Sequence, residues 1–185
     1  MMIVGRTRVE LAEVTRVDGC DDISVAILTN PLKTGSLNVV IEKAMAEQIK
    51  LRLSGEQNTS RHLPEALASF FQMIDNINYE IEVYDIRDGE YLALLFSLKT
   101  GSDILIRLSD AILLSIITHI PIYVNNVLME RQLSPYTPHP EAVPLPINAI
   151  SIKQLNAELQ KAIDAEDYHL AGLLQKELNK RNKSK

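Results

Sequence analysis

The sequence has few of the residues that cross-link a chain or anchor it in a membrane. It contains one cysteine, Cys20, and no tryptophan, so an internal disulfide is excluded and we interpret the thiol as an incidental one at a strand end. The apolar runs are far shorter than the ~20 residues that span a bilayer, and residues 1–6 lack the apolar core and cleavage site of a secretory signal. We therefore predict a cytoplasmic protein that has no membrane partner.

Positive charge is also scarce. The chain has 19 Lys and Arg against 24 Asp and Glu, which gives a net charge of −5 at pH 7. Proteins that bind nucleic acid tightly by neutralising phosphates usually present basic surfaces. This composition excludes a strongly basic nucleic-acid binder, but it leaves room for an enzyme that meets nucleic acid at a local basic patch.

The distribution of proline divides the chain. With 185 residues and 46% hydrophobic content, the chain has the size of one globular domain with an appendage. We predict a main domain over 1–133, a semi-extended linker over 134–150 that is not packed, and a helical hairpin over 151–182. The linker is predicted from its prolines, which are Pro135, Pro138, Pro140, Pro144 and Pro146.

Hydrophobic periodicity predicts the elements of the main domain. Alternating apolar residues indicate three strands over 6–17, 23–28 and 37–41, and a hairpin over 79–86 and 91–98. Helical periodicity indicates helices near 43–54, 64–76 and 110–119. We predict an α+β fold with a mixed, mostly antiparallel sheet and packed helices, followed by a C-terminal α-helical hairpin.

A strand leads directly into a helix near residue 109. Residues 104–108 alternate as a strand does, Ser109 is a good N-cap, and Asp110 suits the first turn of a helix. The helix over 110–119 is apolar on nearly every side, which is typical of a buried helix or of one at a subunit interface. We expect a dimer or larger homo-oligomer, and under the scaffold hypothesis below the copies associate through this helix.

The same junction resembles a known family. Residues 107–112 read Arg-Leu-Ser-Asp-Ala-Ile, and residues 121–124 read Pro-Ile-Tyr-Val. Together they resemble the signature of the bifunctional nuclease domain family, and residues 85–91 resemble a hairpin of that family. The similarity extends over roughly residues 8–133. It implies a divergent bacterial member that hydrolyses phosphodiester bonds of DNA and/or RNA.

The sequence departs from the family pattern at polar positions. Leu108 replaces a proline, and the acidic residue that usually comes shortly before the arginine is absent. Glu42 and Met45 stand where the family has a small residue and a glutamate. In place of a Thr-His-Asp triplet, Pro64 stands at the histidine position and Glu65 at the aspartate position. These departures leave open whether the site is catalytically active.

Phosphodiester hydrolysis requires an activated water and stabilisation of charge on the phosphate. The candidates here are Arg107 as a phosphate clamp, Ser109 as a hydrogen-bond donor and Asp110 as a base or metal ligand. Glu65 is a candidate second catalytic carboxylate. Asp88 together with Asp110 is a candidate pair of ligands for Mg²⁺ or Mn²⁺.

Two hypotheses follow from these residues. A metal-assisted nuclease requires Arg107, Asp110 and a further carboxylate to converge in one pocket. A catalytically inactive oligomeric scaffold, which recruits a protein partner through 151–182, requires only that Arg107 and Asp110 bridge each other.

The C-terminal stretch has its own signature. Apolar residues recur at helical spacing on both sides of an acidic corner, Glu166-Asp167-Tyr168. This pattern resembles the UVR motif, a helical hairpin, although Gln175-Lys176 replaces the usual Arg-Asp pair. The resemblance implies a contact with a protein partner. Two short helices bury little by themselves, so the hairpin requires the main domain, a second copy or a foreign protein as its partner.

Overall fold

The computed structural model of the chain describes residues 5–55, 59–73 and 78–183. Within these residues eight strands form one sheet in the order β3-β2-β1-β7-β4-β5-β6, and β8 pairs with β1. The strands are β1 (Arg6–Val17), β2 (Cys20–Thr29), β3 (Ser36–Glu42), β4 (Tyr79–Arg87), β5 (Glu90–Ser97), β6 (Asp103–Arg107), β7 (Ile122–Asn125) and β8 (Ala142–Val143).

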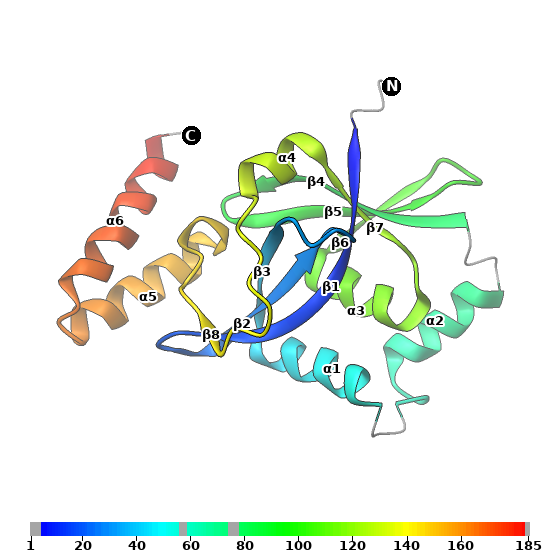
Figure 1. The fold of residues 1–185 in the computed structure, drawn as a ribbon, viewed down its shortest axis with the longest axis horizontal. Helices are drawn as coiled ribbons and strands as arrows, with labels where there is room; N and C mark the ends of the chain where they lie inside the picture. The colour runs from blue at the N-terminus through cyan, green and yellow to red at the C-terminus, as the bar shows by residue number, and fades with distance from the viewer. Residues whose placement is uncertain (1–4, 56–58, 74–77, 184–185) are drawn as a thin grey trace.

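The sheet is mixed and mostly antiparallel, because only the β4–β7 and β1–β8 pairs among those described are parallel. The helices are α1 (Lys43–Ser54), α2 (Leu63–Met73), α3 (Leu108–Thr118), α4 (Asn126–Gln132), α5 (Ile152–Asp164) and α6 (Tyr168–Lys183). Figure 1 shows α1, α2 and α3 on one side of the sheet and the α5–α6 hairpin beyond its β2–β3 end. The predicted fold class is confirmed. No helix within the described ranges is both long and apolar enough to cross a membrane.

Helix α3 lies in the core of the molecule. Its residues Leu108, Ala111, Ile112, Leu113 and Leu114 are buried in the same cluster as the central strands. Burial of these side chains stabilises the folded protein because it removes apolar surface from water. The buried-helix interpretation is confirmed. The association of copies through this helix stays a prediction.

The boundary between β6 and α3 differs from the prediction. The extended backbone continues to Arg107, which is the N-cap residue, and the helix begins at Leu108. Ser109 therefore lies inside the first turn and makes no capping hydrogen bond. The prediction that Ser109 caps this helix is wrong. By contrast, α1 ends where predicted, because Gly55 adopts the left-handed conformation (φ 66°) that ends many helices.

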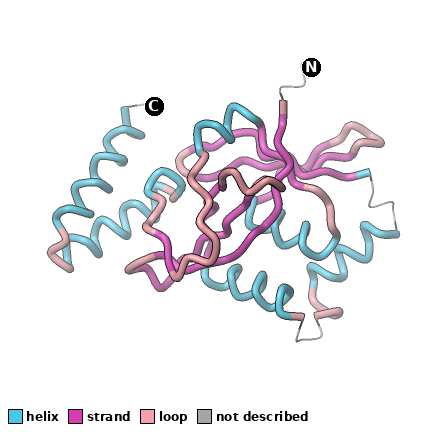
Figure 2. Tube along the Cα trace, in the orientation of Figure 1, coloured by secondary structure: helices cyan, strands magenta, loops and turns pink. Residues whose placement is uncertain are grey.

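The proline-rich segment is packed against the main domain, so the prediction of an unpacked linker is wrong. Strand β8 pairs in parallel with the end of β1, and the hydroxyl of Thr15 donates to the carbonyl of Pro140 at 2.9 Å. Ala149 and Ile150 are buried. Figure 2 shows β8 interrupting the loop that precedes α5. Proline cannot donate from its nitrogen, but it favours extended backbone whose carbonyls still accept. The division of the chain at residues 133 and 151 stays a prediction.

The C-terminal hairpin rests on the main domain. Ser151 caps α5 in a capping box with Gln154. The two helices pack around Ile150, which is fully buried, and Val40 of β3 joins this cluster. The buried residues of the cluster are Ile150, Leu155, Ala162, Ala171, Leu174 and Leu178. Among the three partners that the sequence leaves open, the main domain makes this contact.

The Cys20 thiol lies where α5 meets the β1–β2 turn. Its Sγ donates to Oε2 of Glu158 at 3.2 Å, and Glu158 in turn accepts from Lys161 at 2.9 Å. Burial, followed by the hydrogen bond and negative charge of Glu158, raises the pKa of Cys20 from 9.0 to about 12. The interpretation of Cys20 as a thiol at a strand end is consistent with this place at the start of β2.

We expect Cys20 to resist alkylation in the folded protein. At pH 8 its pKa leaves about a thousandfold less thiolate than an ordinary cysteine has, and only the thiolate is nucleophilic. Labelling by iodoacetamide should be very slow in buffer and fast in denaturant. The variant Glu158→Gln is the control, because it removes the negative charge that raises the pKa and should speed labelling. Rapid labelling of the folded wild type would contradict the burial of the Cys20 thiol beside Glu158.

Candidate functional site

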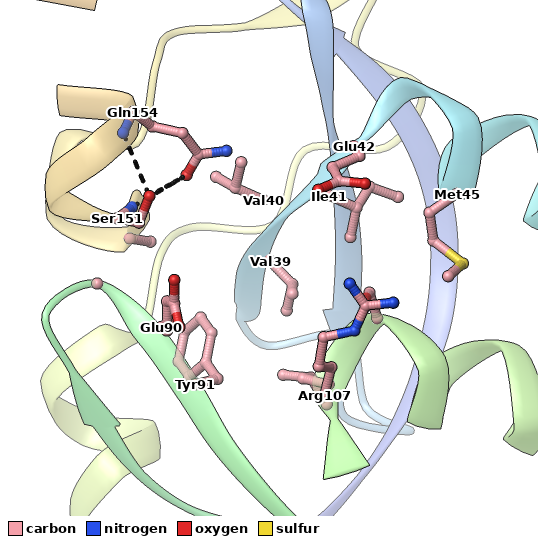
Figure 3. Close-up of a pocket in the computed structure, with 14 residues that line it drawn as sticks. Val39, Val40, Ile41, Glu42, Met45, Glu90, Tyr91, Arg107, Ser151 and Gln154 are labelled. Atoms are coloured by element: carbon pink, nitrogen blue, oxygen red, sulfur yellow. Dashed lines mark hydrogen bonds between the residues drawn. The ribbon is translucent and has the colours of Figure 1, made fainter. Parts of the chain in front are cut away.

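A cavity of about 200 Å³ opens between β3, β5 and the junction of β6 with α3. Figure 3 shows Arg107 and Glu42 on one side of this cavity, and Ser151 and Gln154 on the other. Apolar residues of β3 and Met45 of α1 complete much of the wall. Its polar lining residues are Glu42, Glu90, Tyr91, Arg107, Ser109, Ser151 and Gln154.

Two helices begin at this cavity. Helix α1 follows Glu42 and helix α3 follows Arg107, and neither N-cap residue makes a side-chain cap. Met45 and Ser109, from the first turns of these helices, line the cavity. The first N–H groups of a helix lack partners inside it and carry positive partial charge. Two such ends and a guanidinium favour an anion here, whereas the carboxylates of Glu42 and Glu90 in the lining oppose one.

Arg107, which lines the cavity, forms an ion pair with Asp110, which lies outside the cavity lining. Nε of Arg107 donates to Oδ2 of Asp110 at 2.6 Å, and Nη2 donates to Oδ1 at 3.2 Å. The Asp110 hydrogen bond and charge, with a smaller contribution from the charge of Glu42, raise the pKa of Arg107. The side chains are 70% and 37% exposed. A pair this exposed is worth about 1 kcal/mol or less, so a phosphate can displace the carboxylate.

Glu65 lies away from this cavity and has another partner. It accepts from Nε of Arg52 at 2.8 Å and from Nη2 at 2.9 Å, which joins α2 to the end of α1. The two side chains are 14% and 4% exposed, so this pair is mostly buried. Burial alone would raise the pKa of Glu65, but the hydrogen bonds from Arg52 and Thr59 outweigh it and hold the pKa below 4.5.

Asp88 also lies apart from Asp110. It occupies the β4–β5 turn with a positive φ of 51° and lines a separate depression beside Ile152 and Lys153. Among the residues that the structure describes, no three Asp, Glu, His or Cys side chains gather where they could hold a metal ion. The pair of Asp88 and Asp110 as ligands of Mg²⁺ or Mn²⁺ stays a prediction, and the chemistry below uses no metal.

Comparison with known proteins decides the family. Residues 26–136, well over half of the chain, match the bifunctional nuclease domain. The chain belongs to this family. The family match includes Glu42, Glu90, Arg107 and Ser109 and ends before Ser151. A search of curated proteins finds no match.

The bifunctional nuclease domain here contains site residues that the sequence patterns did not single out. Glu42 ends β3 immediately before α1, and Met45 lies one turn on. Both line the cavity, so Glu42 brings a carboxylate to the region where the family glutamate at position 45 is missing. The strand-to-helix transition at Glu42 mirrors the one at Arg107 and was the available signal. Ser151 and Gln154 come from outside the domain, and no local pattern links them to it.

Proposed function

We propose that this protein is a nuclease that hydrolyses phosphodiester bonds of DNA and/or RNA, and that the cavity at the starts of α1 and α3 binds the phosphate. One observation carries the proposal, namely that Arg107 and first-turn residues of two helices without side-chain caps line one cavity. Membership of the bifunctional nuclease domain family supports the reaction class.

The ion pair of Arg107 with Asp110 suggests how catalysis proceeds. A phosphate that enters exchanges for Asp110 on the planar guanidinium of Arg107, because both anions accept two parallel N–H bonds. Asp110 is then free to accept a proton from the water that attacks phosphorus, while Ser109 donates to a phosphate oxygen. The P–O bond to the leaving oxygen breaks, and this oxygen takes up a proton from solvent. Glu42 is the further carboxylate near Arg107. Glu65 is better explained as the partner of Arg52 than as a catalytic group.

We expect Arg107→Ala to reduce cleavage at least about a hundredfold, because removal of one group that stabilises transition-state charge has an effect of this size. Single-turnover cleavage of labelled single-stranded and duplex DNA and RNA measures the rate. Arg8→Ala is the matched control, because Arg8 is also exposed and paired with a carboxylate, Glu10 at 3.0 Å, but lies on β1. Parallel reactions with EDTA, Mg²⁺ or Mn²⁺ test the dependence on metal.

Equal cleavage by wild type and Arg107→Ala would contradict the proposed phosphate site. Absence of cleavage by wild type on every substrate, with and without metal, would contradict the nuclease function itself. That result would favour the second candidate function, an inactive scaffold.

A specific surface favours the scaffold as the second candidate. Around the corner between α5 and α6, Tyr168 is 72% exposed, Ile163 is 46% exposed and Leu173 is 44% exposed. Aromatic and aliphatic side chains exposed together are typical of protein contacts. The resemblance of this hairpin to the UVR motif supports the same role. We propose that these side chains bind a protein partner while the buried face holds the hairpin to the main domain.

A further inference from the structure

The end of the cavity opposite Arg107 carries hydrogen-bonding groups that the phosphate site does not use. Figure 3 shows Gln154 and Glu90 at this end, across the cavity from Arg107. Ser151 and Glu90 line both this cavity and the neighbouring depression beside Lys153, so the start of α5 lies next to the start of β5. This end of the cavity therefore combines groups of the family domain with groups of the C-terminal hairpin.

The capping box at the start of α5 fixes the orientation of the Gln154 amide. The backbone N–H and the hydroxyl of Ser151 both donate to Oε1 of Gln154 at 3.0 Å. Because a backbone N–H can only donate, the atom that faces it must be the amide oxygen. Nε2 lies on the other side of the amide, toward Val40 in Figure 3, and makes no hydrogen bond to a residue that the structure describes. Gln154 therefore offers N–H donors to the cavity.

Glu90 supplies acceptors at the same end of the cavity. It is the first residue of β5 and is exposed, and no Lys or Arg among the described residues forms an ion pair with its carboxylate. A carboxylate can accept two parallel N–H bonds, one on each oxygen. Its negative charge opposes a phosphate but strengthens hydrogen bonds from N–H donors. This end of the cavity thus suits an uncharged group that carries both N–H donors and an acceptor.

Apolar side chains line the cavity between these groups and Arg107. Val39 and Ile41 are buried, and the ring of Tyr91 also lines the wall. Figure 3 shows Val39 between the two ends of the cavity. An unstacked nucleobase has apolar faces and a polar edge, so it binds where an apolar wall lies beside hydrogen-bonding groups. The volume of about 200 Å³ suits one unpaired base rather than a base pair.

The donors and acceptors at this end match guanine best among the bases. On its Watson–Crick edge, guanine carries two neighbouring N–H donors, at N1 and at the exocyclic amine, beside the carbonyl O6. Adenine and cytosine have an exocyclic amine without a second N–H donor beside it, and uracil and thymine have one N–H between two carbonyls. We propose that the cavity binds an unpaired guanine next to the phosphate on Arg107. Glu90 accepts from N1–H and the amine, and Gln154 donates to O6.

This proposal rests on the phosphate site of the proposed function, and binding of mononucleotides tests it without any cleavage. In isothermal titration calorimetry with the full chain, guanosine 5′-monophosphate should bind at least about tenfold more tightly than the adenosine, cytidine and uridine monophosphates, because one bidentate contact discriminates between bases by this much. Equal binding of the four nucleotides overturns the proposal, and so does the absence of binding by all four.

Two variants test the contacts to the base. Glu90→Gln keeps the size of the side chain but loses one of the two parallel acceptors, so it should remove the preference for guanine. Gln154→Glu keeps the capping box, because glutamate serves there as well as glutamine, but it removes the donor to O6. It should weaken the binding of guanosine monophosphate about tenfold. Preference for guanine that survives in both variants overturns the proposal.

Matched controls carry the same changes elsewhere on the surface. Glu130→Gln on α4 removes an exposed carboxylate, and Gln175→Glu on α6 adds one. Neither residue lines the cavity, so both variants should bind the four nucleotides as wild type does. Circular dichroism shows whether each variant is folded. Loss of the preference for guanine in a folded control variant overturns the assignment of the base contacts to Glu90 and Gln154.

The positions of cleavage separate this proposal from the nuclease function. On labelled single-stranded DNA and RNA of mixed sequence, wild type should cut at phosphates next to guanine, and Glu90→Gln should cut without this preference. Cleavage by wild type beside all bases alike overturns the guanine site while the nuclease function stands. Selective binding of guanosine monophosphate by a chain that cleaves no substrate supports the guanine site and contradicts the nuclease function.

Discussion

Glu65→Ala is expected to destabilise the protein by about 3 kcal/mol, because it removes one partner of a buried ion pair and leaves the other charge uncompensated. Arg52, which is only 4% exposed in its side chain, loses the carboxylate that accepts from its Nε and Nη2. For a chain of this length we expect the Tm to fall by roughly 10 °C. Thermal and urea unfolding followed by circular dichroism measure the change.

An exposed pair of the same chemistry provides the control. Arg8 and Glu10 are 55% and 59% exposed in their side chains and lie 3.0 Å apart. Glu10→Ala should therefore cost less than about 1 kcal/mol. Similar losses of stability in the two variants would show that burial does not increase the contribution of the Arg52–Glu65 pair to stability.

The pH dependence gives a second test of the same pair. The pKa of Glu65 lies below 4.5 in the folded protein, because the hydrogen bonds from Arg52 outweigh the effect of burial. A carboxyl whose pKa is lowered by folding stabilises the protein above its unfolded pKa, and this stabilisation is lost as the pH falls through the folded pKa. The difference in stability between wild type and Glu65→Gln should therefore be greatest at neutral pH and shrink below about pH 4.5.

Arg181→Met is expected to lower the free energy of unfolding of the C-terminal hairpin by about 2–4 kcal/mol, because the substitution leaves buried carbonyl acceptors without a donor. Nη1 of Arg181 donates to the carbonyl of Ile150 at 2.6 Å, and Nη2 donates to that of Ile147 at 3.0 Å. Nε donates to Glu177 at 2.8 Å, which holds the guanidinium in place. At 9% exposure, water cannot easily replace these bonds.

Hydrogen exchange distinguishes local from global loosening. In Arg181→Met, amides of α5 and α6 should exchange faster while those of β1 and β2 keep their protection, because the hairpin has its own cluster of buried residues. Lys180→Met is the matched control, since Lys180 is the next residue along α6 and its side chain is 75% exposed. If the amides of α5 and α6 exchange equally fast in both variants, or exchange faster than wild type in neither, then Arg181 does not hold the hairpin in place.

The β4–β5 turn shows why sequence patterns did not predict the contact between the C-terminal hairpin and the main domain. Asp88-Gly89 predicts a tight turn, and the turn is present. Gly89 has a φ of 83°, and a Cβ at this position would overlap the carbonyl of Ile150. The sequence indicates the turn because glycine tolerates this backbone conformation. It does not indicate that a segment about sixty residues later lies against the turn.

Glu65 shows the same limit for a residue that the sequence proposed as catalytic. Its place beside Pro64 at a helix start is a local feature, and that helix is present. Its role depends on whether Arg52 or Arg107 lies nearest, and this is set by how α1 and α2 pack. Similarly, the scaffold hypothesis requires Arg107 and Asp110 to bridge each other, and these residues, which lie three positions apart, do so. Glu42 joins Arg107 only through the approach of β3 to the start of α3.

The sequence by itself determined the local structure of this protein. Alternation and helical periodicity placed most strands and helices, and Gly55 and Ser151 marked two helix ends, because backbone preference and the pattern of burial depend on near neighbours. The tertiary structure decided which elements meet. It placed β7 between β1 and β4, packed the proline-rich segment, and brought two helix starts to one cavity. Periodicity shows which face of an element is buried, but the fold alone determines what covers it.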